Sequence, residues 1–265
     1  MTLETPISNP DTYLDDMKHS VVDKLFFAAI VQPDIIVDYG CADGAVLRSY
    51  RRMFPDTDLI GYDISKDMIR RARNTPKDAG TRDIIFTDDW SNVQNSIKIG
   101  NYKSPAILLS SVFHEARTYL TDKQFNDFWK LRTFNHGIFR YVIIRDMMVS
   151  RDTHKQSDPL TVARIRSTYS KDLILDWEDV WGSINDHHSL IHFLLTYRYK
   201  ENWYRELNED YLPVDCENFM AMLPDSYRMV YFDHYVLPFL RERVREDFEI
   251  DLTDRTHIKI ILERR

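Results

Sequence analysis

The chain has 265 residues, 43% hydrophobic and 29% charged, which is typical of a globular protein with one large domain or one domain carrying an insertion. Its net charge of −7 creates no general field that attracts nucleic acid, so non-specific nucleic-acid binding is not expected. Two cysteines are too few for a disulfide framework or a zinc site, and no apolar run is long enough to span a membrane. Residues 1–13 are polar and lack the pattern of a secretory signal, so we expect a cytoplasmic protein.

Strand-like and helix-like patterns alternate along the first part of the chain. Short apolar, β-branched runs predict strands, and segments with helical periodicity predict helices between them. The predicted strands cover residues 35–38, 59–62, 83–87, 106–110 and 141–145, and the predicted helices cover residues 13–30, 45–54, 66–73 and 121–134. Such alternation is typical of a parallel sheet with helices on both faces, and these sheets bind ligands at the carboxyl ends of their strands.

The pattern changes after the fifth strand. Residues 150–213 contain no clear strand and predict four helices, at residues 159–165, 171–180, 186–199 and 203–211. Strand patterns return at residues 227–235 and 256–263, and this pair is expected to complete a seven-stranded, mostly parallel sheet as an antiparallel pair at its far side. We therefore predict an α/β core made of residues 1–149 and 214–265, with residues 150–213 as a helical insertion or lid.

The first strand leads into a turn of small residues, which reads Asp-Tyr-Gly-Cys-Ala-Asp-Gly from Asp38 to Gly44. Small side chains let the backbone approach a bound ligand closely, and the carboxylate of Asp38 can hold a cationic amine. About 20 residues later Asp63 ends the second strand, where an acidic side chain accepts hydrogen bonds from both hydroxyls of a ribose. The spacing therefore predicts a cofactor that contains a nucleoside.

These residues resemble motif I and the acidic loop of class I S-adenosylmethionine-dependent methyltransferases, over about residues 21–146 and the closing strands. The resemblance implies a Rossmann-like fold and S-adenosylmethionine as the cofactor. It further implies that Gly40 and Gly44 lie beside the amino-acid part of the cofactor and that Asp63 binds the ribose. Ala42 stands where the family most often has glycine.

The same resemblance implies the residues around the adenine. Ile64 would pack near the base, and either Asp88 or Asp89, after the third strand, would meet its amino group, with Asp88 favoured. Ser110, at the end of the fourth strand, is assigned to the cofactor site as well.

Other interpretations of this motif remain open. Nicotinamide dehydrogenases require a third glycine three residues after the second, whereas here Gly44 follows Ala42 by two and residue 45 is alanine. A strand end with a convenient turn is the purely structural interpretation, which acidic residues at three successive strand ends disfavour. A protein that keeps the cofactor pocket but transfers no methyl group is a further alternative.

His114 and Glu115 follow the fourth strand, where the residues of a class I methyltransferase face the methyl group. Methyl transfer needs an aligned acceptor and a base when the acceptor must lose a proton, and a histidine titrates near neutral pH. We name His114 and Glu115 as candidate catalytic residues. The structural alternative is that His114 caps a helix or bonds across strands.

Two further groups of charges have both structural and functional interpretations. Arg145 and Asp146 end the fifth strand, and a salt bridge at the base of the lid is favoured over substrate contact. Lys24, on the leading helix, is expected to be a solvated surface residue, with contact to the cofactor carboxylate as the alternative.

Histidines and aromatic residues are concentrated in the insertion. His188 and His192 share a helical face, but without further ligands at zinc spacing they indicate a capped amphipathic helix, and no metal is expected. The aromatic side chains are interpreted as lid packing or, alternatively, as the lining of an acceptor pocket; they are Phe193, Tyr197, Tyr199, Trp203 and Tyr204. In the second case four arginines would contact an anionic substrate, namely Arg164, Arg166, Arg198 and Arg205.

The methyl acceptor is constrained mainly by what the fourth strand lacks. Residues 110–113 read Ser-Ser-Val-Phe, without the proline pair of amino-methylating DNA enzymes, and neither cysteine lies where cytosine-C5 enzymes carry their nucleophile. The Ser-Ser-Val-x-His-Glu and Ile-Arg-Asp segments broadly resemble uncharacterised methyltransferase-domain proteins, a resemblance that implies no substrate. A small-molecule acceptor is favoured, and a structured RNA or a protein remains open.

Overall fold

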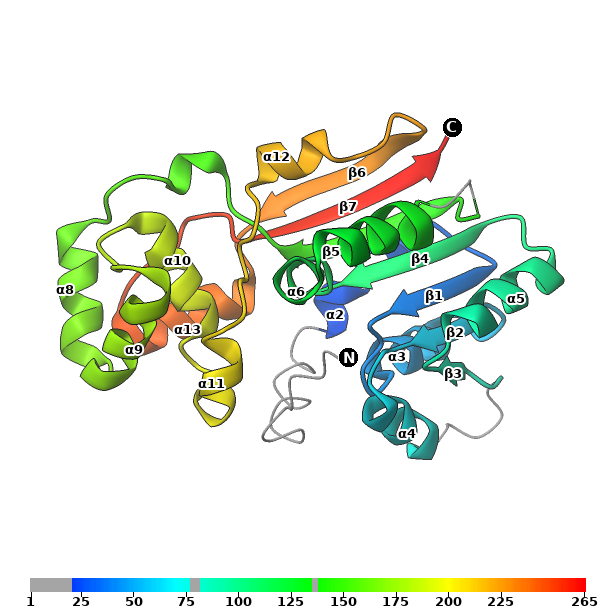
Figure 1. Cartoon of the computed structure of the whole chain (residues 1–265), viewed down its shortest axis with the longest axis horizontal. Helices are drawn as coiled ribbons and strands as arrows, with labels where there is room; N and C mark the ends of the chain where they lie inside the picture. Colours follow the sequence, from blue (N-terminus) through cyan, green and yellow to red (C-terminus); the bar gives the residue numbers. More distant parts are fainter. Residues whose placement is uncertain (1–20, 77–81, 135–137) are drawn as a thin grey trace.

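The computed structural model describes residues 21–76, 82–134 and 138–265. Its seven strands form one sheet in the order β3-β2-β1-β4-β5-β7-β6 (Figure 1). Strands β1 to β5 are parallel, and β7 runs antiparallel to both of its neighbours, β5 and β6. The strands are β1 (Ile35–Tyr39), β2 (Asp58–Tyr62), β3 (Ile85–Thr87), β4 (Pro105–Ser110), β5 (Tyr141–Met147), β6 (Tyr227–Tyr235) and β7 (His257–Arg264). The predicted mostly parallel sheet, closed by an antiparallel pair, is confirmed.

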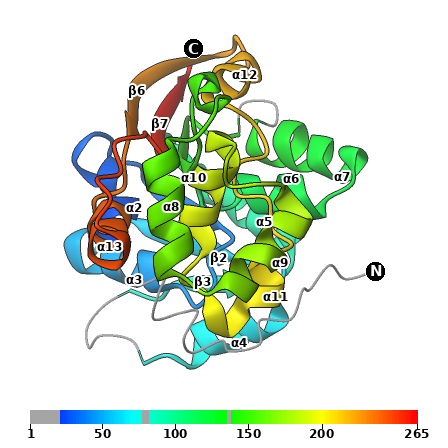
Figure 2. The same cartoon turned by 90° about the vertical axis from the view of Figure 1, so that its left-hand side faces the viewer.

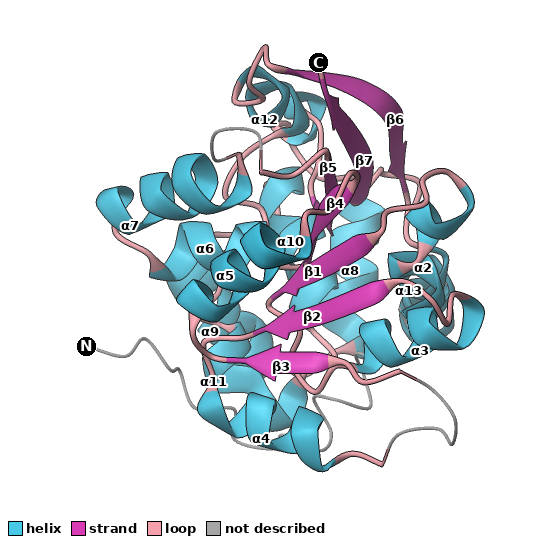
Figure 3. Ribbon diagram, turned by 90° about the vertical axis from the view of Figure 1, so that its right-hand side faces the viewer, coloured by secondary structure: helices cyan, strands magenta, loops and turns pink. Residues whose placement is uncertain are grey.

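Helices cover both faces of this sheet, because successive residues of a strand point to opposite faces (Figure 3). Val37 packs with the helices on one face, in a cluster that includes Val93 and Phe113. Ile36 packs on the other face, in a cluster with Leu47. The helices before and along the parallel strands are α2 (Val21–Lys24), η1 (Phe26–Ala29), α3 (Ala45–Met53), α4 (Lys66–Asn74), α5 (Trp90–Gly100), α6 (Phe113–Tyr119), α7 (Asp122–Asn126) and the π-helix η2 (Asp127–Thr133).

The sequence patterns missed or displaced several of these elements. Helices α5 and α6 were not expected, and β3 begins at Ile85 rather than at residue 83. The described part of the predicted helix 13–30 is broken at Leu25, between α2 and η1, and its residues before 21 lie outside the described chain.

A second group of helices follows β5. It comprises η4 (Arg151–Thr153), α8 (Pro159–Thr168), α9 (Lys171–Trp181), α10 (His187–Thr196), η5 (Lys200–Asn202) and α11 (Trp203–Glu206). Two helices of the closing part of the chain come next, α12 (Cys216–Ala221) before β6 and α13 (Pro238–Phe248) between β6 and β7. Figures 1 and 2 place α8 to α11 and α13 together, on the side of the sheet to which the arrowheads of β1, β4 and β5 point.

These helices have a hydrophobic core of their own. Trp177 of α9, Leu194 of α10 and Val244 of α13 are buried in one cluster. Helix α10 begins with the predicted cap, since the Asp186 side chain accepts from the backbone N–H of Ser189. The amphipathic character expected for α10 is wrong, however, because all its residues from Ser189 to Thr196 are buried. A helix surrounded by other helices has no solvent face to leave polar.

None of the helices in the described part of the chain combines the length and apolar character required to cross a bilayer.

Candidate functional site

The turn after β1 has a backbone that favours glycine. Gly40 and Gly44 have φ of +79° and +81°, and Ala42 between them has φ of +46°. A Cβ atom on Gly40 would lie 2.6 Å from Cγ2 of Val112, and one on Gly44 would lie 2.5 Å from the Phe86 ring. Both glycines are therefore required by conformation and by space, and the Gly40 turn rests directly against the residue two positions before His114.

Asp63 holds this turn from the end of β2. Its Oδ2 accepts a hydrogen bond of 2.8 Å from the backbone N–H of Ala42, and its Oδ1 accepts one of 2.9 Å from that of Ser65. A carboxylate has about four acceptor sites, so it can bind several donors at once.

Asp38 lies on β1, only 3% exposed. Burial raises the pKa of its carboxyl to about 7, although Lys24 opposes the rise and nearby Asp63 adds to it. Lys24 is also 3% exposed, so its interpretation as a solvated surface lysine is wrong. Burial and the charge of Arg145 lower the pKa of Lys24 to about 8, against the attraction of Asp38. Lys24 and Asp38 are thus buried neighbours of opposite charge near the carboxyl end of β1.

The other predicted cofactor residues are more scattered. Ile64 is exposed, and Asp88 lines a separate cavity of about 250 Å³ against α4. The carboxylate of Asp89 is exposed and caps α5 by accepting from the N–H of Ser91. Ser110 is buried at the end of β4, and its hydroxyl has no hydrogen-bond partner among the residues that the structure describes.

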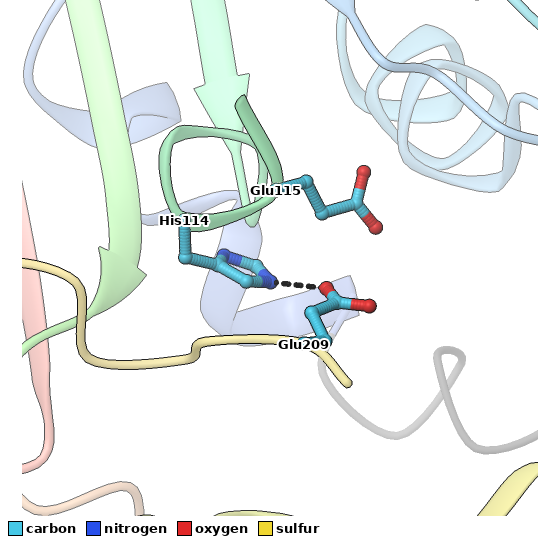
Figure 4. A group of neighbouring side chains, drawn as sticks. All are labelled: His114, Glu115 and Glu209. Atoms are coloured by element: carbon cyan, nitrogen blue, oxygen red, sulfur yellow. Dashed lines mark hydrogen bonds and ion pairs between the residues drawn. The ribbon is translucent and has the colours of Figure 1, made fainter. Parts of the chain in front are cut away.

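His114 is buried on α6 between the carboxylates of Asp146 and Glu209, and Figure 4 shows its contact with Glu209. Its Nδ1 lies 2.6 Å from Oδ1 of Asp146, and its Nε2 lies 2.9 Å from Oε1 of Glu209. Burial opposes the charged ring, but the attraction and hydrogen bonds of Asp146 and Glu209 outweigh it and raise the pKa of His114 well above 6.5. A protonated ring that donates from both nitrogens has no site left to accept a proton, so this arrangement disfavours His114 as the base.

Glu115 follows His114 in α6, and its side chain leaves the helix in a different direction (Figure 4). Its side chain remains 36% exposed and lies 3.1 Å from Nη2 of Arg205, which is also 3.1 Å from Glu209. Burial and the neighbouring charge of Glu209 raise the pKa of Glu115 to about 7, against the attraction of Arg205 and His114. Of the two predicted catalytic residues, Glu115 therefore has the properties of a base at neutral pH.

Ligand atoms of His114, Glu115 and Glu209 lie within 4.8 Å of one another, a spacing that a metal ion could bridge. The arrangement already supplies positive charge from within the protein, because Arg205 pairs with both glutamates and His114 donates to Glu209. Glu209 was not among the residues predicted from the sequence, where it lay in the insertion, 95 positions from His114.

Arg145 and Asp146 are both paired, as favoured from the sequence, but with partners outside the insertion. Arg145 donates to Asp23 of α2 at 3.0 Å and to the hydroxyl of Ser111 at 2.9 Å. Asp146 accepts from the backbone N–H groups of Val112 and Phe113 as well as from His114. The end of β5 therefore fixes the start of α6.

A cavity of about 200 Å³ lies beside these charges, between the ends of β4 and β5 and the helices α10, α11 and α13. Glu115 and Arg145 line it from the sheet side, and Tyr197, Tyr199, Arg198 and Arg205 line it from the helices. Part of the predicted aromatic and arginine set thus meets at one cavity. The rest lies elsewhere: Phe193 and Trp203 are core residues, Tyr204 is 80% exposed, and Arg164 and Arg166 pair on the surface with Glu249 and Glu178.

Residues 36–119 match the family model of a methyltransferase domain. No curated protein sequence matches the chain. The fold is similar to that of an S-adenosylmethionine-dependent methyltransferase from Anabaena variabilis, with a TM-score of 0.52 and 13% identity over 94% of this chain and 85% of that one. The plantazolicin methyltransferase BpumL, solved with S-adenosylhomocysteine, has a TM-score of 0.48 and 15% identity over 97% and 88% of the two chains. Residues 36–119, which include the glycine turn after β1, thus match a methyltransferase domain, and the fold of the chain is similar to that of an S-adenosylmethionine-dependent methyltransferase.

Proposed function

We propose that this chain transfers the methyl group of S-adenosylmethionine to a small-molecule acceptor bound in the cavity beside Glu115. The observation that carries the proposal is the proximity of three carboxylates. Burial raises the pKa of both Asp38 and Glu115, and Asp63 is near enough to add to each rise, which supports a glycine turn that lies near the cavity. A cofactor held by Asp38 and Asp63 would present its methyl group toward Glu115.

The glycine turn fits an S-adenosylmethionine site. Asp38 is a buried carboxyl with a raised pKa, which a cationic amine would return to its charged form. Lys24 is proposed to meet the cofactor carboxylate, the alternative that its burial beside Asp38 supports. Asp63, whose carboxylate lies at the glycine turn, is proposed to accept from the ribose hydroxyls, and Asp88, with Asp89 beside it, is proposed to mark the adenine end.

Bound S-adenosylmethionine supplies an electrophilic methyl group, which is transferred in line to a nucleophilic acceptor atom. The chain's own contribution is to align that atom and to take its proton when it has one. We assign proton acceptance to Glu115. His114 is a positioning residue in this proposal, because it ties α6 to Asp146 and Glu209.

We also propose that residues 150–213 act as a lid over the acceptor, with residues 1–149 and 214–265 as the core. Their helices supply the wall of the cavity that faces the sheet edge. Helix α13, in the closing part of the core, packs in the same hydrophobic cluster as these helices. The proposed compartment is the cytoplasm, in keeping with Cys41 and Cys216, which are both free.

Calorimetry with S-adenosylmethionine, S-adenosylhomocysteine and NAD, combined with a turnover assay, tests the proposal. Binding of the first two, with methyl transfer, would support it. Binding without transfer to any acceptor would favour a cofactor-binding protein that is not an enzyme. Competition by NAD but not by S-adenosylhomocysteine would overturn it.

A further inference from the structure

One donor on the wall of the acceptor cavity has no partner among the described residues. Arg145 is 3% exposed and lines this cavity from β5. Its Nε and Nη1 donate to Asp23 and Ser111, but its Nη2 has no hydrogen-bond partner in residues 21–76, 82–134 and 138–265. A buried polar atom without a partner costs free energy, and a charged one costs more. A ligand atom in the cavity that accepts a hydrogen bond would remove this cost.

The charges around Arg145 favour an anion. Arg145 is opposite Lys259 in the register of β5 and β7, so both side chains lie on one face of the sheet. Both bind the single carboxylate of Asp23, which also accepts from the hydroxyl of Tyr235. Two cations thus share one anion next to the cavity. The charge of Arg145 also helps to lower the pKa of Lys24, after burial itself.

The cavity wall also carries apolar side chains, next to the arginines and tyrosines of the helices. Leu194 and Leu195 of α10 and Leu240 of α13 line the cavity, together with Phe239 and Met147. A buried apolar cavity of about 150 Å³ holds a benzene molecule, so the space of about 200 Å³ accommodates a substituted ring. A ring or short aliphatic body against these leucines would direct one polar substituent toward Arg145.

We propose that the methyl acceptor is a small apolar or aromatic molecule with an anionic group, a carboxylate or a phosphate, and that Nη2 of Arg145 binds this group. The inference rests on the proposed function for its role in methyl transfer. Recognition of the anion, however, depends only on the cavity. Arg145 is then a binding residue for the acceptor as well as the partner of Asp23.

The test uses three probes of similar shape, benzoate, phenyl phosphate and neutral benzamide, with the full chain saturated with S-adenosylhomocysteine. Saturation-transfer NMR titrations measure their weak dissociation constants. One of the anions should bind at least about tenfold tighter than benzamide, as expected for a charge-assisted hydrogen bond in a buried site. Tighter binding of benzoate would identify a carboxylate, and tighter binding of phenyl phosphate a phosphate.

Arg145→Gln should remove the preference for the anion, and Arg164→Gln, on the exposed surface of α8, should leave it unchanged. Equal affinity for benzoate and benzamide in the unaltered protein, or no binding of any probe, would overturn the inference without need of a variant. An anion preference that survives in a folded Arg145→Gln protein would overturn it as well. Failure to bind S-adenosylhomocysteine would instead contradict the proposed function. The same titrations without S-adenosylhomocysteine would still test whether Arg145 binds the anion.

Discussion

Nδ1 of His114 lies 2.6 Å from Oδ1 of Asp146, in a buried pair that joins α6 to the end of β5 across 32 positions of the chain. The same carboxylate accepts from the two backbone N–H groups at the start of α6. This pair places Glu115 at the cavity, because Glu115 follows His114 in the helix. The geometry of the proposed base therefore depends on a histidine that does not itself take the proton.

We expect His114→Ala to lower the free energy of unfolding by about 3 kcal/mol or more, because Asp146 would remain buried without its cation and Glu209 would keep only Arg205. Urea unfolding measures the loss. His187→Ala is the matched control, since its pair with Asp254 is partly exposed and should contribute about 1 kcal/mol or less. An equal loss in the two variants would contradict the buried ion pair.

The same pair predicts a dependence of stability on pH. The pKa of His114 is raised in the folded state, so its contribution is full below the ordinary value of 6.5 and declines as the pH rises toward the folded pKa. The pKa of Asp146 is lowered, so its contribution is present above 3.8 and is lost as the pH falls below that value. The difference in unfolding free energy between wild type and His114→Ala should thus be largest between about pH 4 and 6.5 and should shrink above it. A difference that grows from pH 6 to pH 9 would refute the assignment.

Gly44→Ala should destabilise the protein, and the loss should be smaller in a Phe86→Ala background. Gly44 has φ of +81° and ψ of +17°, a left-handed conformation that costs an alanine about 1–2 kcal/mol. The new methyl group would also lie 2.5 Å from the Phe86 ring, a clash that the Phe86→Ala background removes. Thermal unfolding of the variants in both backgrounds separates space from conformation. An equal loss in the two backgrounds would show that the Phe86 ring yields without cost.

The glycine turn and its acidic residues could be predicted from the sequence because they form a local pattern. Gly40, Gly44 and Asp63 each follow a strand whose apolar run is visible in the sequence. Helix α6 was missed because Val112 and Phe113 continue the apolar run of β4, although its first N–H groups are bound by Asp146. Nothing in the pattern around residue 209 shows that its carboxylate meets His114.

The burial of particular side chains also could not be predicted from local sequence patterns. Lys24 is covered because α2 packs at the strand ends, where Asp38 and Arg145 set its charge environment. Helix α10 carries histidines and threonine yet is enclosed on all sides by the second helical group. Contacts between segments far apart in the chain decide these properties, and a single sequence does not display them.

Asp63→Ala should weaken S-adenosylhomocysteine binding about tenfold or more. The variant removes a charged acceptor for the ribose hydroxyls and releases the N–H groups of Ala42 and Ser65. Isothermal calorimetry measures the affinity. Asp67→Ala, on the outer side of α4 where it pairs with Arg70 and Arg71, is the control and should bind normally. Unchanged affinity in a folded Asp63→Ala protein would remove Asp63 from the cofactor site.

Glu115→Gln tests the proposed base. The pKa of Glu115 is raised to about 7, so the carboxylate that accepts a proton is lost as the pH falls through 7, and the rate should fall with it. Glutamine cannot titrate, so the variant should be about 100-fold slower and should lack this acidic limb, with S-adenosylhomocysteine affinity nearly unchanged. Single-turnover rates with 4-hydroxybenzoate, an acidic phenol of the proposed acceptor class, give the profile. The exposed Glu242→Gln variant is the control and should retain the wild-type profile.

A titration that needs no acceptor completes this test. NMR of ¹³C-labelled glutamate carboxyls should show one group that titrates near pH 7 in the wild type and that disappears in Glu115→Gln. If that resonance persists in the variant, the group with the raised pKa is another glutamate, and Glu206, whose pKa burial also raises, is the next to replace. If the resonance disappears but the rate and its acidic limb remain, Glu115 titrates near neutrality without serving as the base. Alignment of the acceptor in the cavity would then be the chain's main contribution to methyl transfer.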